Sequence, residues 1–220
     1  MDKPAPGLET LNDIKRMMER SSRFISLSGW SGITAGLCAL AGAAFAHRRI
    51  VSYYQTEYLQ SADAITNLKS DLILIAFFTF VSALVFAFLF TFLKSKKEGV
   101  AIWGSAARRL LWNTMLPLLT GGFLIWHLLE NKDYGLVAPA CLLFYGLALV
   151  NGSKYTMGEV RWLGYGEILL GIFNLWFQGK GIIFWWLGFG VLHIIYGLAM
   201  WWKYERQSNA GETLREINAD

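Results

Sequence analysis

The stretch LILIAFFTFVSALVFAFLFTFL, Leu72–Leu93, decides the fold class of this 220-residue chain. It contains no charged side chain, and it is as long as the roughly 20 apolar residues with which a helix crosses the hydrocarbon core of a bilayer. Only 16% of the whole chain is charged, whereas soluble domains carry about 25%. The sequence therefore predicts an all-α integral membrane protein and excludes a soluble globular domain.

Further apolar blocks lie on both sides of this one and predict a bundle of six transmembrane helices in three consecutive hairpins. The predicted spans within the membrane domain at 24–202 are Phe24–Ala46, Leu72–Leu93, Leu110–Leu129, Gly135–Val150, Trp162–Phe177 and Ile182–Trp202. Apolar residues at helical spacing in residues 1–23 predict an amphipathic helix on the cytoplasmic surface, although an extension of the first span fits the same pattern. Residues 203–220 are expected to form a polar cytoplasmic tail.

The distribution of basic residues predicts the orientation of the bundle. One side would hold only five of the 20 Lys and Arg, which leaves 20 − 5 = 15 on the side of both termini. The five are Arg48, Arg49, Lys69, Lys132 and Lys180. Because Lys and Arg concentrate in cytoplasmic segments, both termini are expected to be cytoplasmic. The basic residues flank apolar blocks, so the bilayer is the expected partner, and no direct nucleic-acid binding is predicted.

Several classes of site find no support in the sequence. Cys38 and Cys141 lie inside apolar blocks, and their spacing matches neither a zinc nor an iron–sulfur motif. The motifs of hydrolases, metalloproteases and P-loop proteins are absent. His127 and His193 should lie at different depths, which argues against a shared haem. We therefore predict no catalytic residue, no metal and no cofactor.

Small residues recur at helical spacing and predict close helix packing. In the first span Gly32 and Gly36 form a GxxxG motif, which lets helix backbones approach each other in a membrane. This seam could lie within the bundle or between two copies of the chain, as a homo-oligomer through the first helix. The other glycines that we expect at helix contacts are Gly42, Gly164, Gly171, Gly190 and Gly197.

Glu167 is the most informative polar residue, because a carboxylate in hydrocarbon must be paired, protonated or hydrated. Counted from the turn at 178–181, Glu167 and His193 lie at nearly the same depth, on the small-residue faces of the last two spans. We therefore predict that they form a buried pair. Asn113 and Asn151 share another depth, and Pro117 cannot donate to the Asn113 carbonyl, which is left free. The candidate residues for a ligand or proton site are Glu167, His193, Asn113, Asn151, Asn174 and Tyr196.

Four stretches, which together cover much of the chain, carry a resemblance to known proteins: Met17–Gly32, Ala138–Thr156, Gly188–Gly197 and Lys203–Arg206. In these stretches the sequence resembles a family of six-span inner-membrane proteins of Bacteroidota that has no established activity. The resemblance implies the same topology and a location in the bacterial inner membrane. It assigns no functional residue.

The function that these patterns favour is non-enzymatic. A proton, or a small or lipid-like ligand, would bind between the last four helices and serve sensing or transport. The first alternative is a structural or partner-binding membrane subunit, in which Glu167 and His193 only hold two helices together. The second is an intramembrane enzyme that modifies lipids, with the same two residues as acid and base.

Overall fold

A computed structural model describes residues 27–55, 62–99 and 102–206 of the chain. In these ranges the protein is helical and contains no β-strand. The sequence predictions for residues 1–23 and 207–220 lie outside the described residues.

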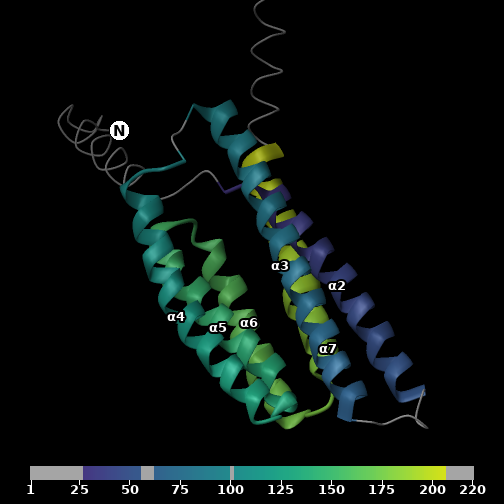
Figure 1. Ribbon diagram of the computed structural model, residues 1–220. Coiled ribbons are helices and arrows are strands. Elements are labelled where there is room, and N and C mark those ends of the chain that lie inside the picture. The colour runs from purple at the N-terminus through teal and green to yellow at the C-terminus, as the bar shows by residue number, and fades with distance from the viewer. Residues whose placement is uncertain (1–26, 56–61, 100–101, 207–220) are drawn as a thin grey trace, which may run out of the picture.

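The described helices follow the apolar blocks of the sequence (Figure 1). The last helix of the bundle runs without a break through α7, a π-helical segment η4, α8 and a second π-helical segment η5, and is called the last helix below. The elements are α2 (Gly29–Gln55), α3 (Ala62–Glu98), α4 (Ser105–Glu130), η2 (Tyr134–Leu136), α5 (Val137–Gly152), η3 (Ser153–Tyr155), α6 (Glu159–Trp176), α7 (Gly181–Trp185), η4 (Trp186–Leu192), α8 (His193–Met200) and η5 (Trp201–Glu205).

Four helical segments of the described chain are long and apolar enough to cross a membrane. They are Gly29–Gln55, Ile65–Lys97, Tyr134–Tyr155 and Gly181–Tyr204. The sequence also predicts spans at α4 and α6, which are not among these four. The 18 residues of α6 include three charged side chains, Glu159, Arg161 and Glu167, and these lower its apolar character.

The first hairpin is longer than its apolar blocks. The predicted first span ends at Ala46, but α2 continues to Gln55, and α3 begins at Ala62 rather than at Leu72. An ion pair of 2.5 Å between Arg49 and Asp71 joins the two helices beyond the apolar blocks. Hydropathy locates only the apolar part of a helix, so it does not predict the polar ends of α2 and α3.

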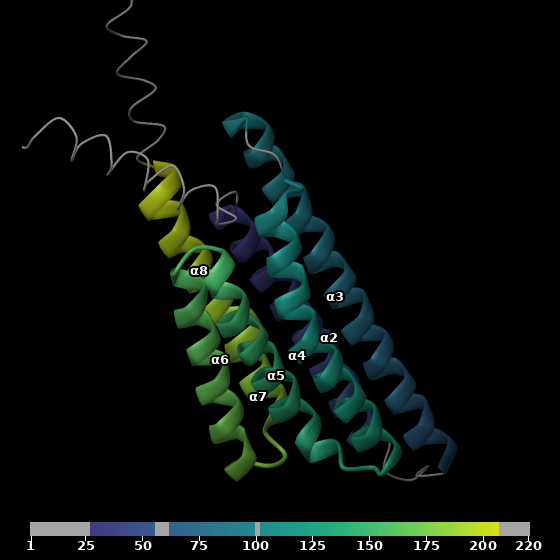
Figure 2. The ribbon, with the colours of Figure 1, turned by 90° about the vertical axis from the view of Figure 1, so that its left-hand side faces the viewer.

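The helices form two groups that meet along the last helix (Figure 1). One group consists of α4, α5 and α6, with α5 in contact with both neighbours. The other consists of α3, α2 and the last helix, with α2 between the other two. The turned view shows the last helix beside α5 and α6, and its contacts with them join the two groups (Figure 2).

Glycines let α2 and the last helix approach within backbone contact. A Cβ added to Gly197 would lie 2.5 Å from the backbone nitrogen of Ile33, and one added to Gly36 would lie 2.7 Å from the carbonyl oxygen of Gly190. Gly32 faces Gly197 in the same seam. The GxxxG face of the first span is therefore filled within the chain, by its own last helix.

The other predicted packing glycines also lie at helix contacts. Gly164 of α6 and Gly146 of α5 are reciprocal, since a Cβ on either would lie within 2.8 Å of the carbonyl oxygen of the other. Gly171 faces Leu143 of α5, and Gly42 of α2 faces Thr79 of α3. The contacts of Gly164 and Gly171 fix α6 against α5 and so determine where Glu167 points.

Candidate functional site

Glu167 lies in the middle of α6 and is completely buried, with 0% of its surface exposed. Its side chain points at the last helix, where Gly188 leaves room for the carboxyl group. A Cβ added to Gly188 would lie 2.5 Å from Glu167 Oε2 and equally close to Leu142. Neither carboxyl oxygen has a hydrogen-bond partner among the described residues. The carboxyl group is thus enclosed by protein and, within the described part of the chain, accepts no hydrogen bond.

His193 is a titratable group beside this carboxyl. Its Nδ1 lies 3.4 Å from Glu167 Oε1 and 3.1 Å from the carbonyl oxygen of Gly188, and its Nε2 lies 2.8 Å from the Tyr145 hydroxyl. A carbonyl only accepts, so Nδ1–H donates to Gly188, and Nε2 then accepts from the Tyr145 O–H. This arrangement suits a neutral imidazole. We refer to Glu167, His193, Tyr145 and Gly188 as the Glu167 cluster.

The Glu167 cluster lies where the two groups of helices meet. Glu167 and Tyr145 come from α6 and α5 of one group, whereas Gly188 and His193 come from the last helix of the other. Gly188 is part of the π-helical segment η4, which ends immediately before His193. Single turns of π-helix are rare in proteins and are frequently found at functional sites.

Tyr145 is a member of the cluster that the candidate residues from the sequence do not include. Its ring also stacks on the imidazole of His193, with 5.4 Å between the ring centroids. A depth argument could have found it. Counted from Thr156, in the connection between α5 and α6, Tyr145 lies 156 − 145 = 11 residues back and Glu167 lies 167 − 156 = 11 residues ahead.

Asn174 is a second buried polar residue of α6, two turns beyond Glu167. It is 0% exposed, and neither atom of its amide has a hydrogen-bond partner in the described part of the chain. Like Glu167, it faces a glycine of the last helix, because a Cβ on Gly181 would lie 3.9 Å from Asn174 Nδ2.

The structure places the other candidate residues away from this cluster. Asn151 Nδ2 donates to the backbone carbonyl of Asn113 at 2.8 Å, across the contact between α5 and α4. The Asn113 side chain donates to the carbonyl of Arg109 within its own helix. The ring of Tyr196 lies against Gly32 of α2. These three residues therefore lie at other contacts. Of the candidate residues predicted from the sequence, only His193 lies beside Glu167.

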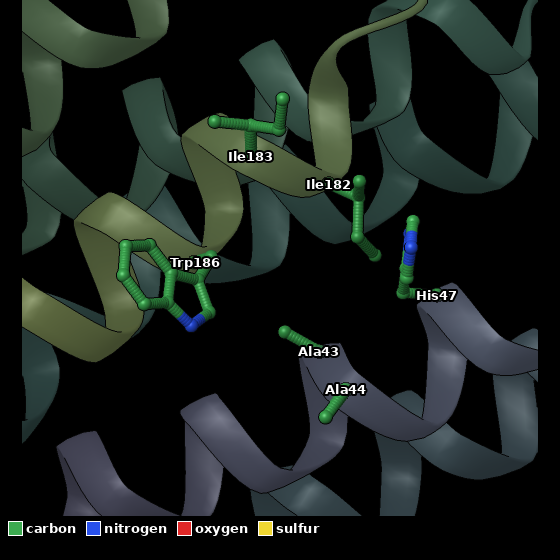
Figure 3. A pocket seen from close by; sticks show the side chains of 6 residues that line it. All are labelled: Ala43, Ala44, His47, Ile182, Ile183 and Trp186. Carbon is green, nitrogen blue, oxygen red and sulfur yellow. The ribbon is translucent and has the colours of Figure 1, made fainter.

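A cavity of about 230 Å³ lies between α2 and the beginning of the last helix (Figure 3). Its lining is apolar except for His47, and it does not include the Glu167 cluster. The lining residues are Ala43, Ala44, His47, Ile182, Ile183 and Trp186.

The described ranges contain no group of three or more His, Cys, Asp or Glu side chains that could hold a metal ion. Comparisons of the chain with protein-family models, with curated proteins and with solved structures gave no match.

Proposed function

We propose that the chain is a multi-pass protein of the bacterial inner membrane that binds a proton at Glu167 and uses this binding for sensing or transport. In the proposed topology six helices cross the membrane, and both termini are cytoplasmic. The observation that carries the proposal is the Glu167 carboxyl group, which is buried at the junction of two helix groups and has no hydrogen-bond partner among the residues that the structure describes.

The length and packing of α4 and α6 support their assignment as the third and fifth spans. At 1.5 Å per residue, the 26 residues of α4 extend about 39 Å and the 18 residues of α6 about 27 Å, close to the thickness of a hydrocarbon core of about 30 Å. Both helices pack along α5, whose segment Tyr134–Tyr155 is long and apolar enough to span. Helices that pack along a membrane-spanning helix lie at the same depth of the bilayer, and this supports spans at α4 and α6.

The tight surroundings of Glu167 favour a proton over a larger ligand. A single added carbon at Gly188 would already collide with Glu167 Oε2. The cavity between α2 and the last helix, where an apolar ligand would fit, is lined by other residues. A proton needs no such space.

The cluster offers the proton two positions. It can sit on the carboxyl group of Glu167, beside a neutral His193. It can also sit on the imidazole, which then becomes a cation 3.4 Å from the Glu167 carboxylate. In the second state the Tyr145 hydroxyl can turn to accept from Nε2. The two positions belong to different helix groups, so a change in proton number alters the attraction between the groups.

The test is infrared difference spectroscopy of the protein in lipid vesicles as pH is changed over the range in which it stays folded. The proposal predicts a carbonyl band of a protonated carboxyl group that titrates with pH and is missing in Glu167→Gln. The matched control is Glu159→Gln, which removes a partly buried carboxylate from the same helix and should keep the band.

The alternative is a structural role for Glu167 and His193, and the same experiment separates the two. If no titrating band depends on Glu167, and Glu167→Gln changes only the melting temperature, the pair is a structural contact between helices and the proton-binding proposal is wrong.

A further inference from the structure

The described residues contain four buried side-chain nitrogen or oxygen atoms without a hydrogen-bond partner, and all four belong to two residues. They are the two carboxyl oxygens of Glu167 and the two amide atoms of Asn174. Both side chains are 0% exposed. Buried polar groups in proteins are almost always hydrogen-bonded to protein or to ordered water. Each of these residues therefore marks a place that water or another polar group can reach.

The two residues share one geometry with the last helix. Glu167 faces Gly188 directly, and Asn174 lies beside Gly181, with 3.9 Å between Nδ2 and a Cβ added there, although Ala138 of α5 is nearer to that Cβ at 2.9 Å. The two positions are seven residues apart on α6 and seven apart on the antiparallel last helix, since 174 − 167 = 7 and 188 − 181 = 7. Seven residues are about two helical turns, or roughly 10 Å along the axis. Both side chains thus point into the same seam.

The other half of α6 buries apolar side chains instead. Toward its N-terminus, Val160 and Leu163 are 6% and 7% exposed, and Met200 of the last helix is 1% exposed. Apolar packing of this kind excludes water. Among the described residues, the buried side-chain atoms without a hydrogen-bond partner therefore extend from Glu167 only toward the connection between α6 and α7, where Asn174 lies.

We infer that Asn174 is the entry station of a hydrated proton path that connects Glu167 to the end of the bundle at the α6–α7 connection. This end is the outer one in the proposed topology. The inference rests on the proposed function, because it assigns the side from which Glu167 takes its proton. A proton arrives on water at Asn174, passes along hydrogen-bonded water, and binds to the Glu167 carboxylate.

Asn174 itself gains and loses no proton in this path. Its amide nitrogen donates and its amide oxygen accepts, so it can hold a water molecule between two hydrogen bonds. Gly181 and Gly188 add no side chain of their own at the levels of Asn174 and Glu167, where Ala138 and Leu142 of α5 approach the last helix. Asn174 is therefore a positioning residue, and its removal should slow the arrival of protons while leaving the Glu167 carboxyl group intact.

The experiment follows the exchange of the Glu167 proton for deuterium in vesicles, through the shift of its carbonyl band after transfer to D2O. Asn174→Leu is similar in volume and removes both amide atoms. The inference predicts roughly tenfold slower exchange, the effect of losing one or two water-holding hydrogen bonds. Asn174→Ser keeps a donor and an acceptor and should exchange nearly as fast as the wild type. Phe173→Leu, at the same depth but 54% exposed, should have no effect.

Exchange at the wild-type rate in folded Asn174→Leu would overturn the inference. Asn174→Val carries the same prediction with a smaller side chain, should the leucine variant not fold. A protein without any Glu167 carbonyl band would instead disprove the proposed function, so the two failures are distinguishable.

Discussion

Asn151 of α5 donates a hydrogen bond to the backbone carbonyl of Asn113 in α4, with 2.8 Å between nitrogen and oxygen. In an unbroken helix this carbonyl would accept from the backbone N–H four residues later, but that residue is Pro117, which has none. A side chain of the neighbouring helix supplies the missing donor. The proline in α4 and the asparagine in α5 are thus two parts of one helix contact.

This relationship predicts a non-additive pair of substitutions. Asn151→Leu should lower the free energy of unfolding by about 0.5–1.5 kcal/mol, because the Asn113 carbonyl loses its donor. In a Pro117→Ala background the new backbone N–H can take over, so the same substitution should cost less. A double-mutant cycle on thermal or denaturant unfolding in detergent measures the difference. Equal costs in both backgrounds would mean that the hydrogen bond contributes nothing.

The seam between α2 and the last helix predicts a large effect of one methyl group. Gly197→Ala would place a Cβ 2.5 Å from a backbone nitrogen of α2, so the two helices must move apart, at a cost of about 1–3 kcal/mol. Gly122→Ala is the control, because no atom lies within 4 Å of its Cβ position and alanine favours helix. Melting temperatures should fall for the first variant and stay or rise for the second. The opposite order would contradict the close contact.

Tyr145 should set the hydrogen bonding of His193. Tyr145→Phe removes the hydroxyl that lies 2.8 Å from Nε2, so this nitrogen should lose its partner while Nδ1 keeps the Gly188 carbonyl. The ¹⁵N chemical shift of Nε2 should move, and stability should fall by about 0.6 kcal/mol, the average for such bonds in membranes. Tyr165→Phe on the exposed side of α6 should change neither. An unchanged Nε2 shift in Tyr145→Phe would exclude the bond.

The stability of the protein should depend on pH through Glu159, which lies at the predicted inner end of the bundle. Partial burial by itself would raise the pKa of this carboxyl, but hydrogen bonds from Lys203, its backbone and Tyr204 together hold the pKa below its ordinary value. A carboxyl with a lowered folded pKa stabilises the protein above its unfolded pKa, and this contribution disappears as pH falls through the folded value.

The corresponding measurement compares the wild type with Glu159→Gln. The variant should melt at a lower temperature than the wild type at neutral pH, and the gap should close as pH falls below about 4.3, the ordinary pKa of glutamate. A gap that stays constant through this acidic range would show that the charge of Glu159 plays no part.

The proposed topology predicts the sides on which single cysteines react. In a background without Cys38 and Cys141, Lys132→Cys should react with a membrane-impermeant thiol reagent added outside intact cells, and Lys96→Cys should not. Both should react after the membrane is opened, which shows that each site is accessible. The reverse pattern would require both termini to lie outside.

The sequence predicts the central part of each helix better than its ends. Apolar composition locates the α3 block without ambiguity, since a bilayer demands it. By contrast, α2 continues to Gln55 and α3 begins at Ala62, because hydrogen bonds within a helix extend it beyond its apolar block. Apolar composition does not predict these polar ends of the helices. The π-helical geometry of η4 has no sequence signal that we can identify.

The pairing of Glu167 with His193 shows how far a depth argument reaches. Equal distance from the turn places Glu167 and His193 at nearly the same depth. The residue of the last helix directly opposite Glu167, however, is Gly188. His193 reaches the carboxyl because helical side chains lean toward the N-terminus, which carries its ring back to Gly188. The same reasoning correctly placed Asn113 and Asn151 at one level, where the Asn151 amide donates to the free Asn113 carbonyl between α4 and α5.

The contact between α2 and the last helix has a consequence for how the chain is made. Gly36 and its neighbour Gly190 are separated by 190 − 36 = 154 residues of sequence. At a ribosomal speed of about 5–20 residues per second, roughly 8 to 30 seconds pass between their synthesis. During that interval the last helix, which covers the glycine face of α2 in the folded protein, has not yet been made. A chain interrupted shortly before Gly190 would therefore leave the glycine face of α2 without the helix that covers it.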